Sequence, residues 1–189
     1  MPADLFAAVP PGTDQRDPFE LFMGSHTRIR EALGAMRSLA AGGDGAEPGP
    51  VQRGLAEQLL TCFDNVVLPH HREEEREFWP LASRVRGNPD DHARFVEAAV
   101  RLQHEHVDLE ARWAALQPAL SSMARGHGAA PPAAELGELA TLYAQHAQFE
   151  DEVLVPLARH LLSPTDQSRL AIAVLLSRLP AAKWGMVYI

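Results

Sequence analysis

The sequence contains one cysteine, Cys62, among 189 residues, which excludes a disulfide within the chain. It has no run of about 18 apolar residues, so no segment is predicted to span a bilayer. Basic residues are scarce: 17 lysines and arginines against 25 aspartates and glutamates give a formal net charge of −8. That balance disfavours binding to nucleic acid or to an anionic membrane. The first residues lack the features of a signal peptide, which predicts a cytoplasmic protein.

Strand-like patterns are also missing, because no segment alternates apolar and polar residues in the manner of a β-strand. Proline and glycine instead divide the chain at residues 42–50, 86–90 and 126–132. Between these breaks, apolar residues recur at steps of three and four, which is typical of amphipathic helices. Four long helices and a shorter fifth are therefore expected, near residues 17–41, 51–85, 90–125, 133–161 and 165–179.

The short connections favour an all-α fold, an antiparallel up-down-up-down four-helix bundle with an additional C-terminal helix. The length suits one domain. The predicted organisation is a flexible N-terminal arm at 1–16, the bundle at 17–161, and a C-terminal helix with an apolar tail at 162–189. The tail is expected to dock on the bundle or to meet a partner.

Histidines and glutamates occupy the predicted core stripes, where ionisable side chains are uncommon. The pattern His70-x3-Glu74 recurs as His146-x3-Glu150. Both copies continue with an acidic residue and, after four more residues, Pro-Leu-Ala. Residues four apart lie on one helix face, so each ring and carboxylate can reach one metal ion, or the carboxylate can bridge two.

Each remaining long helix carries one stripe histidine, His26 in the first and His106 in the third. Four imidazoles and two carboxylates are too many for one tetrahedral zinc, and they suit two five- or six-coordinate ions with open positions. Mixed nitrogen and oxygen ligation favours iron, with manganese or zinc as replacements. Ferritin-like di-iron proteins use Glu-x-x-His and four carboxylates, so this site should differ from theirs in redox poise.

The combined pattern, with its acidic-x4-Pro tails, resembles the hemerythrin-like HHE cation-binding domain over roughly residues 17–161. The resemblance implies two non-heme iron ions, bridged by oxide and by the carboxylates of Glu74 and Glu150. It is closer to bacterial iron-centre-repair and stress-response members than to invertebrate oxygen carriers, although the separate cysteine-bearing N-terminal domain of the repair proteins is lacking. The implied metal ligands are His26, His70, Glu74, His106, His146 and Glu150.

Three further residues are candidates beside these six. Glu110, one turn past the third-helix histidine, is either a seventh ligand, a partner of a ligand or a surface charge. His71 points about 100° round the helix from its neighbour, and it is a ligand only if the site extends that far. Tyr143, the candidate catalytic residue, either donates a hydrogen bond to a bound oxygen species or packs in the core.

Other features give weaker expectations. Pro69 predicts a kink or a wider turn in the second helix. Cys62 is expected to line the core near the site. Apart from the motif glutamate, the run at 73–77 is expected to face water. An ion pair between Arg30 and Glu110 across the bundle is a further hypothesis.

Three functions stay open at this point. The first is binding of, or reaction with, O₂, peroxide or nitric oxide at an open iron position, for redox sensing or detoxification. The second is an iron donor or store for iron–sulfur centre repair. The third is a di-iron oxygenase of a biosynthetic pathway. Small molecules are the predicted partners, and whether the protein is an oxidoreductase is undecided.

Overall fold

Every regular element that the computed structural model describes is helical, over residues 17–43, 47–85 and 87–177. The predicted arm at 1–16 and the apolar end of the predicted tail, within 178–189, lie outside the described residues. Inside them the expected all-α fold is confirmed.

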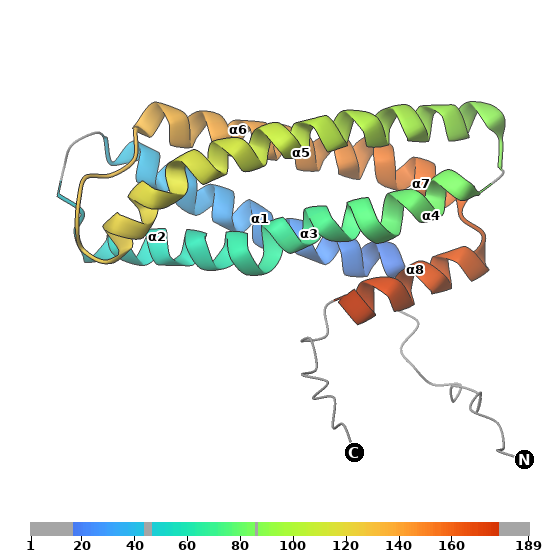
Figure 1. The fold of residues 1–189 in the computed structure, drawn as a ribbon, viewed down its shortest axis with the longest axis horizontal. Helices are drawn as coiled ribbons and strands as arrows, with labels where there is room; N and C mark the ends of the chain where they lie inside the picture. The colour runs from blue at the N-terminus through green and yellow to red at the C-terminus, as the bar shows by residue number, and fades with distance from the viewer. Residues whose placement is uncertain (1–16, 44–46, 86, 178–189) are drawn as a thin grey trace, which may run out of the picture.

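The long helices lie side by side along the molecule, and a short C-terminal helix packs at one end (Figure 1). In chain order the α-helices are α1 (Pro18–Ala41), α2 (Pro50–Cys62), α3 (Leu68–Glu73), α4 (Trp79–Arg84), α5 (Pro89–Ala124), α6 (Ala133–Phe149), α7 (Val155–Leu161) and α8 (Pro164–Ser177). α1 packs against α2 and α6, and α5 packs against the same two helices. α8 packs against α1. The chain therefore forms a helical bundle.

Polar residues at the predicted breaks start the helices. The Asp17 carboxylate accepts a hydrogen bond from the backbone N–H of Phe19 at 2.9 Å. The side-chain oxygen of Asn88 accepts one from the N–H of Asp90 at 2.9 Å. Such caps satisfy backbone donors that the first helical turn leaves without partners. The two caps define where α1 and α5 begin, and therefore how far along each helix its histidine lies.

Three turns of π-helix interrupt the second and fourth predicted segments, each ending two residues before a proline. A proline has no backbone N–H, and its ring clashes with the carbonyl four residues earlier, so the helix widens there. The wider turn predicted from Pro69 is confirmed. The turns are Phe63–Val67 before Pro69, Glu74–Phe78 before Pro80 and Glu150–Leu154 before Pro156.

Two of these π turns begin at the motif glutamates. The carbonyl of Glu74 accepts a hydrogen bond from the N–H of Trp79, five residues later, and the carbonyl of Glu150 accepts one from Val155 in the same way. Up to each glutamate the helix keeps its α-helical period, so the histidine and glutamate still share a face. Beyond it, the wider turn changes the direction in which the following side chains point.

The apolar core consists of two clusters, with the buried ionisable side chains between them. On α5, for example, Leu102 belongs to one cluster and Leu109 to the other, and His106 lies between them. The polar groups are thus enclosed by apolar side chains in both directions along the bundle. A charge in such surroundings is costly unless an opposite charge or a metal ion compensates it.

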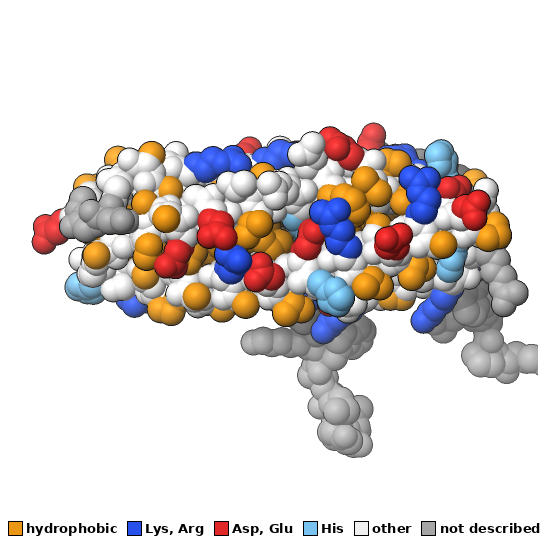
Figure 2. Space-filling model, turned by 90° about the horizontal axis from the view of Figure 1, so that it is seen from above, with side chains coloured by type: hydrophobic (Ala, Val, Ile, Leu, Met, Phe, Trp, Pro, Cys, Tyr) orange, Lys and Arg blue, Asp and Glu red, His pale blue; other side chains and the backbone are white. Residues whose placement is uncertain are grey.

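The surface carries charges of both signs. On the face drawn in Figure 2, acidic and basic side chains alternate with apolar ones, without a broad patch of one sign. None of the helices in the described ranges is long and apolar enough to cross a membrane.

Candidate metal centre

The six side chains predicted as metal ligands lie together in the interior of the bundle. All are buried, and the most exposed of them, His146, keeps only 4% of its accessible surface. The four histidines come from four different helices, and each glutamate is the first residue of a π turn. The set is His26 on α1, His70 on α3, His106 on α5, His146 on α6, and Glu74 and Glu150 on the π turns.

One group of donor atoms comprises His26, His70 and Glu150, whose ligand atoms all lie within 4.8 Å of one another. The Nε2 atoms of the two histidines are 2.8 Å apart. Nε2 of His26 lies 3.0 Å from Oε2 of Glu150, and Nε2 of His70 lies 4.0 Å from the same oxygen. Two ring nitrogens and a carboxylate oxygen therefore converge on one point.

A second group comprises Glu74, His106, His146 and Glu150, again within 4.8 Å. Nε2 of His106 lies 3.1 Å from Oε2 of Glu74, and Nε2 of His146 lies 2.8 Å from Oε1 of Glu150. Glu150 thus turns Oε2 to the first group and Oε1 to the second. Glu74 also faces both, because its Oε1 is 3.9 Å from Nε2 of His70. Each of the two carboxylates therefore turns one oxygen to each group of histidines.

Several of these atoms have no hydrogen-bond partner within the described residues, although they lie close together. They are both carboxylate oxygens of Glu74, Oε1 of Glu150, and the Nε2 atoms of His106 and His146. A buried polar atom without a hydrogen-bond partner costs about 1–3 kcal/mol, and the close contacts between these imidazoles and carboxylates offset only part of that cost. A cation between the two groups would satisfy all of them at once. The donor set therefore fits metal ions, and oxygen with nitrogen donors suits iron.

The charges of the cluster lead to the same conclusion. Burial, and then the neighbouring Glu150 carboxylate, hold the pKa of Glu74 well above its usual range. Burial would also raise the pKa of Glu150, but the histidines, above all His146, outweigh it and hold that pKa well below its usual range. Burial lowers the pKa of His70 far below its usual value. Two carboxylates among buried imidazoles form an environment that favours divalent cations.

Neighbouring carboxylates favour the protonated form of two of the histidines. Burial lowers the pKa of His26, but Asp151 and Glu150 outweigh it and raise the pKa to about 9 from 6.5. Burial acts likewise on His146, where Glu150 and Glu105 raise the pKa to about 9. A metal ion can bind only when it displaces these protons.

The stability of the metal-free protein is therefore expected to fall as the pH rises from about 6.5 to about 9. In this window the folded state keeps protons on His26 and His146 that the unfolded chain has lost, so their contribution is present below pH 6.5 and lost on approaching pH 9. Burial lowers the pKa values of His70, His71 and His106, so these rings act in the opposite direction, but only until the unfolded chain loses its protons just above pH 6.5. Thermal unfolding of chelator-treated protein across this range measures the effect. A melting temperature that rises with pH there would contradict it.

Carboxylates outside the donor groups contact the outer ring nitrogens of His26, His106 and His146. Nδ1 of His26 lies 2.6 Å from Asp151, Nδ1 of His106 lies 2.9 Å from Glu75, and Nδ1 of His146 lies 2.9 Å from Glu105. A carboxylate on the outer ring nitrogen fixes the tautomer, so that Nε2 faces the metal, and makes the ring a stronger donor. Asp151 is itself bound by Arg30.

The sequence pattern did not indicate these partners. Glu75 is exposed, as expected for the run at 73–77, but its carboxylate also contacts Nδ1 of His106. The signal was present in the acidic residue that follows each motif glutamate, Glu75 in one copy and Asp151 in the other. These two residues contact the single histidines of α5 and α1, because each π turn aims them at a neighbouring helix.

Replacing such a partner should weaken metal binding without removing a ligand. Asp151→Asn is expected to lower metal affinity about 10–100-fold, since it removes the charge that orients His26. Competition with a chelator of known affinity measures the change. Glu152→Gln, at an exposed neighbouring position, is the matched control. Equal affinities for the two variants would contradict a role for Asp151.

His71 lies inside the bundle, beside the six. It is buried, its ring stacks on His106 with centroids 3.8 Å apart, and its Nδ1 lies 2.8 Å from Oε1 of Glu110. His71 also forms a third group within 4.8 Å together with His106 and His146. Glu110 is partly exposed and contacts this histidine. The hypothesis of an Arg30–Glu110 ion pair is wrong, because Arg30 binds Asp151 across the bundle.

Aromatic side chains surround the second group. Tyr143 is buried with its ring centroid 6.5 Å from that of His146, and its hydroxyl has no hydrogen-bond partner within the described residues. Burial, with a smaller contribution from Glu110, raises its pKa above the ordinary value, so the hydroxyl stays protonated. Trp79 stacks on His106 at 5.2 Å, a contact that the sequence did not indicate.

Two other expectations need correction. Glu73 was expected to face water but is buried, because α3 turns it towards a cavity beside His70. Cys62 was expected near the site but lies at the edge of the core, with Sγ 3.8 Å from the carbonyl oxygen of Arg28. It borders a separate groove between α1 and α2.

A helical bundle with buried histidines and glutamates in overlapping groups defines a cation-binding protein. The profile of the hemerythrin HHE cation-binding domain matches residues 17–158, most of the chain, and the protein belongs to that family. No curated protein and no solved structure matched the sequence.

Proposed function

We propose that the protein is a non-heme di-iron protein that binds or reacts with O₂, peroxide or nitric oxide, in redox sensing or detoxification. The observation that carries the proposal is the position of Glu150, whose two oxygens face two different groups of histidines. The proposal includes the antiparallel up-down-up-down order of the four long segments, with α8 added. The six proposed ligands are His26, His70, Glu74, His106, His146 and Glu150, with His71 and Glu110 as further candidates.

Iron is proposed because of the donor set. Imidazole and carboxylate together suit iron, and two ions at these positions would supply electron transfer and open coordination positions. The chain itself supplies the bridges, the outer carboxylates that hold the rings, and apolar walls that include Phe63, Leu102 and Leu109. Such walls admit small neutral molecules and disfavour large charged ones.

Tyr143 is the proposed contact for the exogenous ligand. Its buried hydroxyl has no partner among the described residues and lies near the second group. A hydroxyl there is a hydrogen-bond donor for a small molecule, and no metal ligand is lost when it is removed. Tyr143→Phe is therefore expected to change azide affinity while leaving iron content unaltered.

Rapid mixing separates the proposed function from its alternatives. Reduced, iron-loaded protein should react quickly with O₂, nitric oxide or peroxide, and azide should bind the oxidised protein with a change in its visible spectrum. If the reduced protein reacts with none of these three molecules but readily releases iron to a chelator, the iron-donor function replaces this one. The cavity beside His70 has mostly polar lining residues, which does not favour an oxygenase with an apolar substrate.

A further inference from the structure

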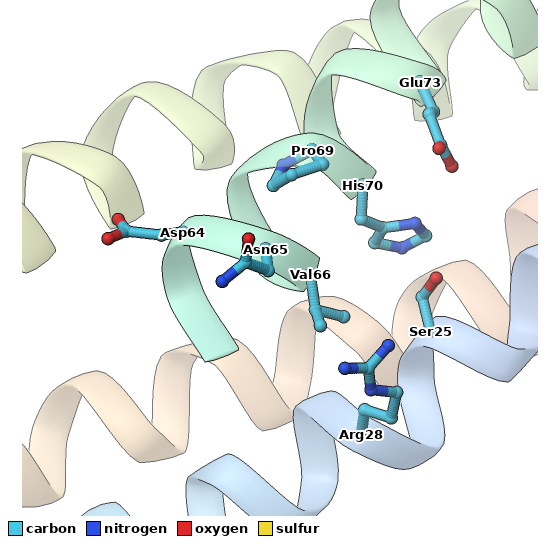
Figure 3. A pocket seen from close by; sticks show the side chains of 8 residues that line it. All are labelled: Ser25, Arg28, Asp64, Asn65, Val66, Pro69, His70 and Glu73. Carbon is cyan, nitrogen blue, oxygen red and sulfur yellow. The ribbon is translucent and has the colours of Figure 1, made fainter. Parts of the chain in front are cut away.

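One buried histidine among the described residues, His71, lies outside the six proposed ligands. Figure 3 shows the imidazole of the preceding residue, His70, projecting towards Ser25 of α1. His71 lies about 100° further round α3, and its ring contacts α5 and α6 instead. Its nearness to His106 and His146 is compatible with a seventh ligand or with a residue that supports the ligands.

The ring of His71 lies flat against the ring of His106. Their centroids are 3.8 Å apart, and their planes are within 8° of parallel. An imidazole binds a metal ion through a lone pair in the plane of its ring, so the ion must lie in that plane. Two nearly parallel planes stacked in this way do not meet within about 2 Å of both rings, the length of a metal–nitrogen bond. The stacked pair therefore cannot bind one ion through both rings.

Trp79 covers the other face of His106. Its ring centroid is 5.2 Å from that of His106, and the planes are 22° apart. Among the described residues Trp79 makes no ring contact with His71, so the two rings stack on opposite faces. At the edge of His106, Nδ1 lies 2.9 Å from Glu75. A contact at one edge leaves a ring free to tilt, whereas a flat ring on each face resists tilting.

His71 is itself fixed in place. Its Nδ1 lies 2.8 Å from Oε1 of Glu110, a contact in which the ring nitrogen donates and the carboxylate accepts. Tyr143 stacks on the ring of His71, with centroids 5.8 Å apart and planes 18° apart. The support of His106 thus extends to two further side chains.

We infer that His71 is a positioning residue and not a metal ligand, and that His71 and Trp79 hold the ring of His106 between them so that Nε2 faces the second group in the metal-free protein. This inference rests on the proposed metal centre, in which His106 is a ligand. Nε2 of His106 already lies 3.1 Å from Oε2 of Glu74. A donor that is held in its binding orientation loses less freedom when the ion binds, so the affinity is higher.

The test compares variants by the number of iron ions bound per chain and by affinity for iron, measured without oxygen against a competing chelator. His71→Ala removes the ring and should weaken the binding of one ion about 10–100-fold, the usual effect of losing a residue that supports a ligand. His71→Phe keeps a flat ring without a donor atom, and it should bind two ions with close to the native affinity. Arg72→Ala, exposed at the next position, is the matched control and should bind as the native chain does.

Loss of a ligand has a different result, because His106→Phe should lose the ion of the second group. If His71→Phe binds iron as weakly as His71→Ala, or if His71→Ala keeps the native affinity, the inference is overturned alone. If His106→Phe keeps both ions at native affinity, the proposed set of ligands fails, and the inference with it.

Native protein provides a second measurement, which decides whether His71 is a ligand if His71→Phe does not fold. Protein shown to hold cadmium-113, with nitrogen-15 in its histidines, should show a coupling between the two nuclei at His106, because this coupling passes through the metal–nitrogen bond. No such coupling is expected at His71. A cadmium coupling at His71 would overturn the inference, whereas a lack of coupling at every histidine would contradict the proposed metal centre.

Discussion

Glu74→Ala and Glu150→Ala are each expected to reduce bound iron from the proposed two ions per chain to roughly none. Each carboxylate turns one oxygen to each group of histidines, so its removal takes a donor from both metal positions at once. A single remaining carboxylate offsets less of the positive charge of the cations in a buried site. Metal analysis of the purified variants measures the loss.

The matched control is Glu152→Ala, on the same π turn as Glu150 but exposed. It should keep its iron. Circular dichroism should show Glu74→Ala folded, because burial raises the pKa of this carboxyl and its removal takes away a group that is costly to ionise there. Glu150→Ala loses ion pairs with His26 and His146, so its circular dichroism must show a folded protein before its iron is counted. Equal iron content in the three variants would refute the bridging role.

Removing the metal from the native chain is expected to lower its melting temperature by roughly 8–16 °C. A ligand that binds only the folded state stabilises it by about 4 kcal/mol at a free concentration 1,000 times its Kd. For a domain of this size, 1 kcal/mol corresponds to about 2–4 °C. The metal-free protein also keeps the buried atoms without hydrogen-bond partners that the cation would satisfy.

The comparison requires thermal unfolding of one preparation before chelation, after chelation and after iron is restored. Recovery of the original melting temperature shows that the metal, and not damage by the chelator, is responsible. An unchanged melting temperature after complete removal of the metal would mean that the cluster is stable without a cation.

The fold was predictable because the relevant signals are local. Steps of three and four define the helices, and prolines and glycines define their ends. The six buried residues at the centre were also visible in the sequence, because His-x3-Glu keeps both side chains on one helix face. Even the wider turn near Pro69 follows from the missing N–H of proline.

The surroundings of the site depend on geometry that spacing does not contain. Glu75 reaches His106 only because a π turn redirects the residues after Glu74. Arg30 meets Asp151 instead of Glu110, since α1 packs against α6. Such contacts follow from the rotation and pairing of helices, which a single sequence leaves open.

The measurement that tests the central claim most directly is metal analysis of protein purified without oxygen from cells supplied with ample iron, combined with absorption spectra before and after oxidation. The account predicts two iron ions per chain and an oxidised form that absorbs in the near ultraviolet, as oxo-bridged ferric pairs do. One ion per chain, or zinc in preference to iron under these conditions, would contradict it.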